Sequence, residues 1–135
     1  MLPQLHQHIL SELDRSGRAD TVFVFGAVVF DLLSIGVNSA LATSKTGVAQ
    51  IVFVLFMVGV VIVTGCAVGA LINGWRSCAA YHEALLKMYE AEGVAKYFPT
   101  SGMRLGRTRN VLFLLLTGSL GTLAIVVPLL VRGAS

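Results

Sequence analysis

The sequence predicts an all-α integral membrane protein with three transmembrane helices, and two observations lead to this class. The chain has 135 residues, of which 56% are hydrophobic and 13% are charged, whereas soluble domains carry about 25% charged residues. The apolar residues are concentrated in three runs, 21–42, 49–73 and 110–131. As a helix rising about 1.5 Å per residue, each run can cross about 30 Å of hydrocarbon. We therefore expect residues 1–135 to form a single membrane domain.

The segment before the first apolar run is predicted to be a short amphipathic helix over residues 2–16. Its apolar residues recur at spacings of three and four, which places them on one helix face: Leu2, Leu5, Ile9 and Leu13. We expect Gly17 to end this helix and Asp20 to cap the next one. The acidic residues of this leader and the length of the apolar run argue against a cleaved signal peptide.

The second apolar run is predicted to continue into a cytoplasmic helix over residues 74–92. Large side chains are spaced three and four residues apart along it: Trp75, Cys78, His82, Leu85 and Tyr89. This stripe either packs against the N-terminal helix or forms a seam between subunits. Gly93 or Pro99 is expected to end the helix. The Pro, Gly and Ser residues of 93–109 predict a loop that returns the chain to the membrane.

The basic residues predict the orientation of the chain. Eight of them lie before the first run or between the second and third runs, and only Lys45 and Arg132 lie on the opposite side. The positive-inside rule therefore places the N-terminus in the cytoplasm and the C-terminus outside, in what we expect to be a bacterial inner membrane. The bilayer accounts for the net charge of +3 without a nucleic-acid partner. Four juxtamembrane arginines are topology signals or ligands for anionic lipid headgroups: Arg76, Arg104, Arg107 and Arg109.

Asp31 is the main candidate for a functional residue, because it is the only charged residue within the three apolar runs. A carboxylate near the middle of a span costs about 2.5–3.5 kcal/mol. Ser34 and Asn38 follow at i+3 and i+7, so the three side chains form an intramembrane polar stripe on one helix face. Such a stripe marks an ion or proton path, or it joins helices or subunits by hydrogen bonds with Asp31 neutral.

Small residues predict close helix packing in the second and third runs. Gly65 and Gly69 form a G-x-x-x-G pattern, and Gly121 belongs to a small-residue face of the third run. A three-helix monomer cannot bury all of these faces against itself. We therefore expect a homo-oligomer, or docking onto other membrane subunits.

The sequence contains no motif for enzyme chemistry. His6 and His8 point to different sides of a helix, and no Cys or His pair has the spacing of metal ligands, so no metal site is expected. The glycine-rich phosphate and dinucleotide motifs, the serine nucleophile elbow and the zinc-protease motif are all absent. We expect no catalytic residue, no cofactor and no enzymatic activity.

The layout of residues 2–89 resembles SLATT-type domains, which are small helical membrane modules found beside bacterial nucleotide-signalling defence systems. A leading helix, two spans joined by a short turn, and the stretch Arg-Ser-Cys-Ala-Ala-Tyr-His-Glu-Ala-Leu-Leu at 76–86 carry the resemblance. It implies a pore-forming effector. The third apolar run lies outside the resemblance, and no site residue carries over from it.

Two functions follow from these features. The first is a small oligomeric pore or membrane-permeabilising protein, in which the polar stripe lines an ion-transport path and the cytoplasmic helices gate it. The second is a non-catalytic accessory or structural subunit of a larger membrane complex, held by its small-residue faces. A small carrier with Asp31 as its proton site is a third, but three spans leave little room for alternating access.

Overall fold

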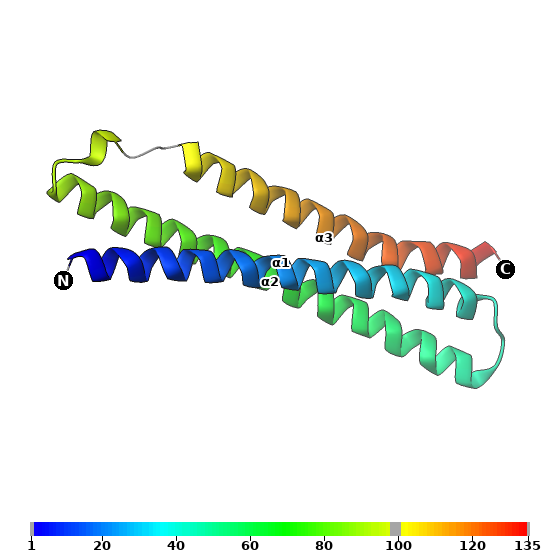
Figure 1. Cartoon of the computed structure of the whole chain (residues 1–135). Helices are drawn as coiled ribbons and strands as arrows, with labels where there is room; N and C mark the ends of the chain where they lie inside the picture. Colours follow the sequence, from blue (N-terminus) through cyan, green and yellow to red (C-terminus); the bar gives the residue numbers. More distant parts are fainter. Residues whose placement is uncertain (1, 98–100, 135) are drawn as a thin grey trace.

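The computed structural model describes residues 2–97 and 101–134, and all regular structure in these ranges is helical. The three long helices are α1 over Leu2–Ala42, α2 over Gly47–Ala91 and α3 over Ser101–Ala134. A short 3₁₀ helix, η1, covers Ala95–Tyr97. In the elongated bundle of Figure 1, α1 and α3 run in the same direction, and α2 runs antiparallel to both. The predicted all-helical class is confirmed.

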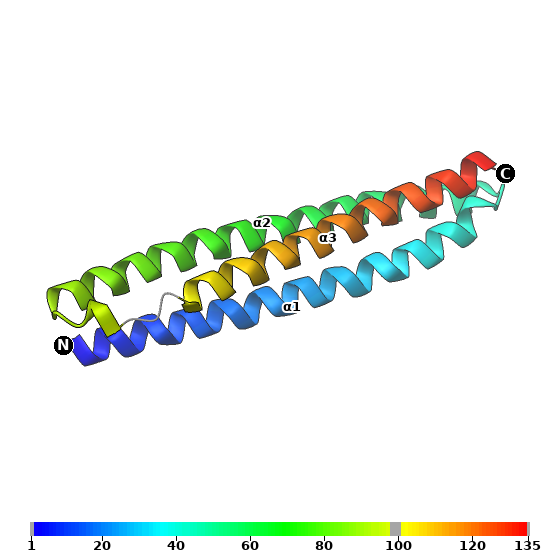
Figure 2. The ribbon, with the colours of Figure 1, turned by 90° about the horizontal axis from the view of Figure 1, so that it is seen from above.

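Each long helix packs against both of the others, and the view from above shows α3 running beside α1 and α2 along the bundle (Figure 2). A tight turn joins α1 to α2, in which the N–H of Ser44 donates to the carbonyl of Leu41 over 3.0 Å. At the other end, α2 stops where Gly93 takes a φ of 71°, a left-handed conformation that glycine adopts without strain. Gly93 therefore ends the helix; Pro99, the alternative, lies outside the described residues.

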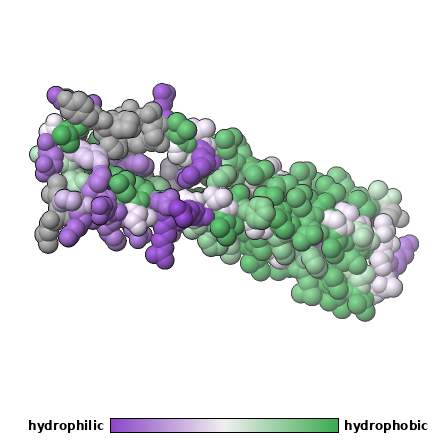
Figure 3. All heavy atoms as spheres, in the orientation of Figure 1, coloured by the Kyte–Doolittle hydropathy of each residue, from purple (hydrophilic) through white to green (hydrophobic). Residues whose placement is uncertain are grey.

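The bundle is divided along its length into a polar end and an apolar section (Figure 3). The polar end comprises residues 3–20, 74–96 and 104–109, and the apolar section comprises the three apolar runs. All three helices are long and apolar enough to cross a membrane, with mean hydropathies of 1.9, 2.9 and 2.3 over their most apolar windows. Many large side chains of the apolar section face outward, as Phe25 does with 71% of its surface exposed. This surface is suited to lipid.

The buried residues of the bundle repeat every seven positions. On α1 they are spaced alternately by four and three: Asp20, Val24, Ala27, Asp31, Ser34 and Asn38. On α3 the same spacing links Gly121, Ala124 and Pro128. A repeat of this length lets long helices pack at a small crossing angle. Most of these positions hold small or polar residues, so within the apolar section these faces of α1 and α3 are more polar than the outer surface.

The N-terminal part of α1 differs from the prediction. The expected separate helix over 2–16 and the first span form one continuous helix. A glycine inside a helix costs only about 1 kcal/mol, and Gly17 packs where a Cβ would lie 3.4 Å from a guanidinium nitrogen of Arg109. Asp20 is not a cap: it lies within the helix and is 6% exposed.

The connection between α2 and α3 is also shorter than predicted. We expected a loop over 93–109, but α3 begins at Ser101, so residues 101–109 are helical. The glycine and serine residues that suggested a loop are followed by Arg104, Leu105 and Arg107, which favour helix. Residues 98–100 of the expected loop lie outside the described residues. The result is a third helix that extends into the polar end.

Candidate functional site

The predicted polar stripe lies inside the three-helix bundle. Asp31, Ser34 and Asn38 have no exposed surface, because their positions on α1 coincide with the seven-residue repeat that faces α2 and α3. The sequence predicted that the three side chains share a face, and the structure places that face toward the interior of one chain. The stripe therefore does not line a surface that a second copy could reach in this conformation.

Asp31 makes its contact with α2. The hydroxyl of Thr64 lies 3.4 Å from each carboxylate oxygen of Asp31, in position to donate to either. Thr64 also packs against α3, since a Cβ added to Gly121 would lie 2.5 Å from its methyl carbon. The three helices therefore meet in one layer formed by Asp31, Thr64 and Gly121. Here a carboxylate, a hydroxyl and a bare backbone come together within the apolar section.

Polar atoms extend from this layer in both directions along the bundle. Ser34 and Asn38 continue toward the end of α1, and Asn38 lies about 10 Å beyond Asp31 at about 1.5 Å per residue. On the other side, Thr117 lies one helical turn before Gly121 on α3 and is completely buried. We call Asp31, Ser34, Asn38, Thr64 and Thr117 the polar core.

Several atoms of the polar core have no hydrogen-bond partner among the described protein atoms. They are the hydroxyl oxygens of Ser34 and Thr117 and both amide atoms of Asn38. Leaving a buried polar group unpaired costs about 1–3 kcal/mol, and a bilayer offers no water from outside to satisfy it. These groups are therefore suited to hold water or a transported ion, or to pair with groups exposed by a rearrangement of the helices.

Apolar residues close the polar core at both ends. Val24 and Leu71 are buried between it and the polar end, with 5% and 0% exposure. Toward the other end, Phe53 is 4% exposed, and the guanidinium of Arg132 lies 5.3 Å from the centre of its ring. Small residues fill much of the space between these closures: Ala27, Ala67 and Ala124. In this conformation the polar core is enclosed.

The predicted packing glycines divide into two groups. Gly121 is buried in the Asp31 layer, as described. Gly65 and Gly69 are exposed, and a Cβ at either would meet no atom within 4 Å. Gly65 lines a shallow groove of about 380 Å³ on the outside of the bundle, between α2 and α3, together with Gly118. The G-x-x-x-G pattern therefore makes no helix contact within the chain.

A second polar layer lies at the boundary between the apolar section and the polar end, and sequence reasoning missed it. The carboxylate of Asp20 packs on Gly74, where a Cβ would lie 2.8 Å from one of its oxygens. Arg109 of α3 acts on this carboxylate electrostatically, and the neighbouring Asn110 is 5% exposed. The available signal was the seven-residue repeat, which extends back from Asp31 through Val24 to Asp20.

The four juxtamembrane arginines also fall into two groups. All four are exposed, but only Arg104, Arg107 and Arg109 line a pocket of about 380 Å³ between α2 and α3. The guanidinium of Arg107 lies 5.9 Å from the centre of the Trp75 ring, a distance at which a cation is attracted to an aromatic face. Three of the four arginines are therefore brought together.

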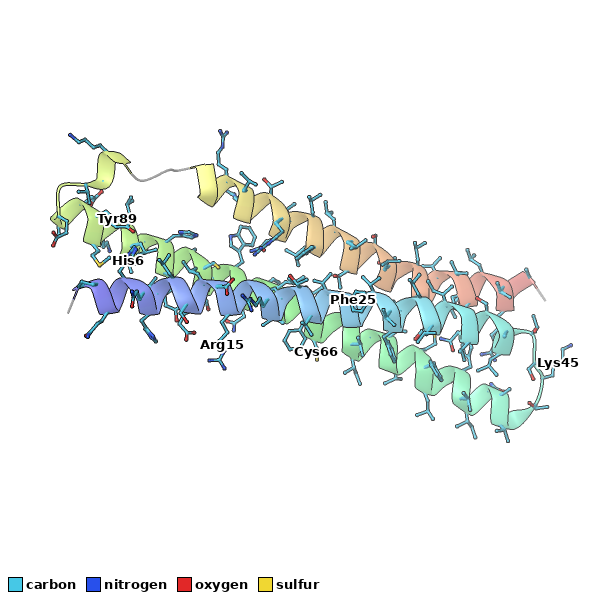
Figure 4. The ribbon with its side chains drawn as sticks, in the orientation of Figure 1. His6, Arg15, Phe25, Lys45, Cys66 and Tyr89 are labelled. Atoms are coloured by element: carbon cyan, nitrogen blue, oxygen red, sulfur yellow. The ribbon has the colours of Figure 1, made fainter. Side chains whose placement is uncertain are left out.

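The far part of the polar end is held by a contact between His6 of α1 and Tyr89 of α2 (Figure 4). The Tyr89 hydroxyl lies 3.1 Å from Nδ1 of His6, and the two rings meet edge to face with 5.6 Å between their centres. Ile9 and Leu85 are buried at 7% and 2% exposure in the same end of the bundle. The stripe predicted along residues 74–92 therefore packs against the N-terminal part of α1, which is the first of its two alternatives.

The chain matches no protein-family model, no curated protein and no solved structure. Its class is therefore defined by the fold alone, as an all-helical protein with three helices that could span a membrane. The resemblance to SLATT-type domains stays a prediction.

Proposed function

We propose that this chain is a small oligomeric membrane protein that makes the bilayer permeable to protons or small ions, with the polar core as its permeation path. The observation that carries the proposal is the polar core itself. An acidic side chain at membrane depth lies in line with hydroxyl and amide groups that lack partners. Such groups are costly in a bilayer and mark ion or proton paths by default.

Asp31 is the group on which the path depends. It can accept a proton from one side and release it to the other, and Thr64 can donate a hydrogen bond to its carboxylate. The unpaired oxygens of Ser34 and Thr117 on either side can each hold water. No basic residue lies within the three apolar runs, so Asp31 has no ion-pair partner there to fix its charge.

The conformation described here corresponds to a closed form in this proposal, because apolar residues cover both ends of the polar core. Opening would require α1 to move against α2 and α3. Both α1 and α2 extend beyond the apolar section into the polar end, where His6 and Tyr89 hold them together. We assign gating to this end, which the positive-inside rule places in the cytoplasm.

The proposal is tested by flux through liposomes that contain the purified protein. A pH-sensitive dye inside the vesicles reports proton entry when a potassium gradient and valinomycin set the membrane potential. We expect Asp31→Asn to lower the protein-dependent proton flux at least tenfold without changing the oligomer size measured by light scattering. Asp14→Asn is the matched control, since Asp14 is exposed at the polar end and pairs with Arg18. Unchanged flux together with a lower free energy of unfolding would instead establish Asp31 as a packing residue within the bundle.

A second function, an accessory subunit of a larger membrane complex, is favoured by the groove between α2 and α3. Gly65 and Gly118 line it, and a Cβ at either position would meet nothing within 4 Å. Small residues on an outer face let another membrane helix approach closely. Expression of the chain alone distinguishes the two functions: a permeabilising protein accumulates as a discrete oligomer, whereas an accessory subunit is degraded or stays monomeric.

A further inference from the structure

We propose that the pocket between α2 and α3 at the edge of the polar end binds an anionic phosphate group that carries a neighbouring hydroxyl, as the headgroup of an anionic glycerophospholipid does. The pocket is independent of the polar core and of the permeation path. Trp75, Cys78, Ala79 and His82 line it from α2, and α3 supplies Arg104, Gly106, Arg107, Arg109 and Asn110.

The charge of the pocket selects an anion. Three arginines line it, and no acidic residue is among the described residues of its wall. Asp20 lies close enough to act on Arg109 and Cys78, so it offsets part of the charge of Arg109. Arg104 and Arg107 form no ion pair with a described carboxylate. Guanidinium groups bind phosphate oxygens in pairs of hydrogen bonds, which makes these two arginines the main ligands.

Two buried polar atoms without partners indicate that the ligand also carries a hydroxyl. Asn110 is 5% exposed and lines the pocket, and its Oδ1 has no hydrogen-bond partner among the described atoms. Nδ1 of His82, on the opposite wall, is likewise buried and unpaired. The ionised phosphodiester of a lipid offers only acceptor oxygens, which suit the arginines, whereas a hydroxyl beside it can donate to Oδ1 of Asn110 and can donate to or accept from Nδ1 of His82, according to the tautomer of the ring.

The position of the pocket matches the level of lipid phosphates. Trp75 follows the second apolar run within two residues and Asn110 begins the third, so the pocket lies where a bilayer changes from hydrocarbon to headgroups. Indole rings favour this level. The backbone at Gly106 is open, with no atom within 4 Å of an added Cβ, which leaves room for a headgroup to enter from the side.

The sole tryptophan of the chain lies in the wall of the pocket, so its fluorescence reports binding directly. The purified protein in a neutral detergent is titrated at constant ionic strength with short-chain phosphatidylglycerol, short-chain phosphatidylcholine or inorganic phosphate. We expect a saturable change of emission with phosphatidylglycerol and none with phosphatidylcholine over the same range. Saturation by inorganic phosphate at the same concentration would support the anion site and identify free phosphate as its ligand.

Substitutions distinguish a built site from general attraction to positive charge. Arg104→Gln should weaken phosphatidylglycerol binding at least tenfold, and Arg15→Gln, which removes an exposed charge from the other face of the polar end (Figure 4), should leave it unchanged. Native mass spectrometry of the same samples counts the lipids that remain bound and does not depend on Trp75. Equal weakening by the two substitutions, or equal binding of phosphatidylcholine, would overturn the proposal.

Discussion

The hydroxyl of Thr64 lies 3.4 Å from both carboxylate oxygens of Asp31, and the same side chain occupies the space beside Gly121. One threonine on α2 therefore makes a polar contact with α1 and a packing contact with α3. Because the hydrophobic effect does not drive helices together within a bilayer, such contacts carry much of the association of the three helices. Substitutions can separate the two contacts.

The packing contact predicts that Gly121→Ala destabilises the bundle. The added Cβ would lie 2.5 Å from the methyl carbon and 2.7 Å from the hydroxyl oxygen of Thr64, so α2 and α3 must move apart. Overpacking of this kind costs about 1–3 kcal/mol. The free energy of unfolding, measured by titration with sodium dodecyl sulfate and circular dichroism, should fall by that amount.

The control for this prediction is Gly118→Ala, three residues away on the same helix. A Cβ at Gly118 would meet nothing within 4 Å, so the free energy of unfolding should not fall. The double substitution Gly121→Ala with Thr64→Ala should recover part of the loss, because it removes the crowded atoms. An equal fall at the two glycines would mean that the Thr64 contact does not set the cost, because helix propensity favours alanine at both positions.

The polar contact is expected to give a measurable coupling between Asp31 and Thr64. A double-mutant cycle with Asp31→Leu and Thr64→Val removes each polar group while keeping the number of non-hydrogen atoms in the side chain. Interhelical hydrogen bonds in membranes contribute on average about 0.6 kcal/mol and at most about 1.7 kcal/mol. We expect a coupling energy in this range from unfolding in sodium dodecyl sulfate. A cycle that pairs Asp31→Leu with Ser119→Ala, whose hydroxyl bonds its own helix at Leu116, should give none.

The sequence predicts those elements of the fold that depend on local properties such as hydropathy and residue spacing. Length and hydropathy alone located the three apolar runs, and i+3 and i+7 spacing placed Asp31, Ser34 and Asn38 on one face. The ends of the helices were less well predicted. Gly17 was expected to end a helix because glycine has a low helix propensity. Its packing beside Arg109 depends on a residue far along the chain.

The partners of the candidate site could not be predicted, because they are separated widely in sequence. Thr64 is 33 residues from Asp31, and Tyr89 is 83 residues from His6. Nothing in a single apolar run distinguishes Thr64 from the other hydroxyl residues of the membrane segments. The register of three helices decides which of them meets the carboxylate, and that register is a property of the assembled bundle. The direction in which the stripe faces depends on the same register.

The contact of His6 with Tyr89 predicts that the polar end opens locally when the hydrogen bond is removed. His6→Phe keeps an aromatic ring beside Tyr89 but removes the nitrogen 3.1 Å from its hydroxyl. A hydrogen bond contributes about 0.5–1.5 kcal/mol, so amide exchange in residues 5–13 should accelerate about 2- to 10-fold. Hydrogen-exchange mass spectrometry should find residues 25–40 unchanged.

His8→Phe is the matched control, because His8 is exposed on the same helix. It introduces the same ring two residues away without removing a described contact. Accelerated exchange in both variants would attribute the effect to the added phenyl group. Accelerated exchange throughout α1 in His6→Phe alone would mean that the polar end and the apolar section unfold as one unit.

The distribution of basic residues predicts the orientation of the bundle, which labelling of single cysteines measures directly. Arg15 and Lys45 are both exposed and lie in different parts of the molecule, at the polar end and in the turn between α1 and α2 (Figure 4). With Cys66 and Cys78 replaced by alanine, Lys45→Cys should react with a membrane-impermeant maleimide added to intact cells. Arg15→Cys should react only after the membrane is permeabilised, because translocating the many basic residues of the polar end is unfavourable. The reverse pattern would place the arginine pocket on the outer face, and labelling of both positions in intact cells would mean that the chain inserts in two orientations.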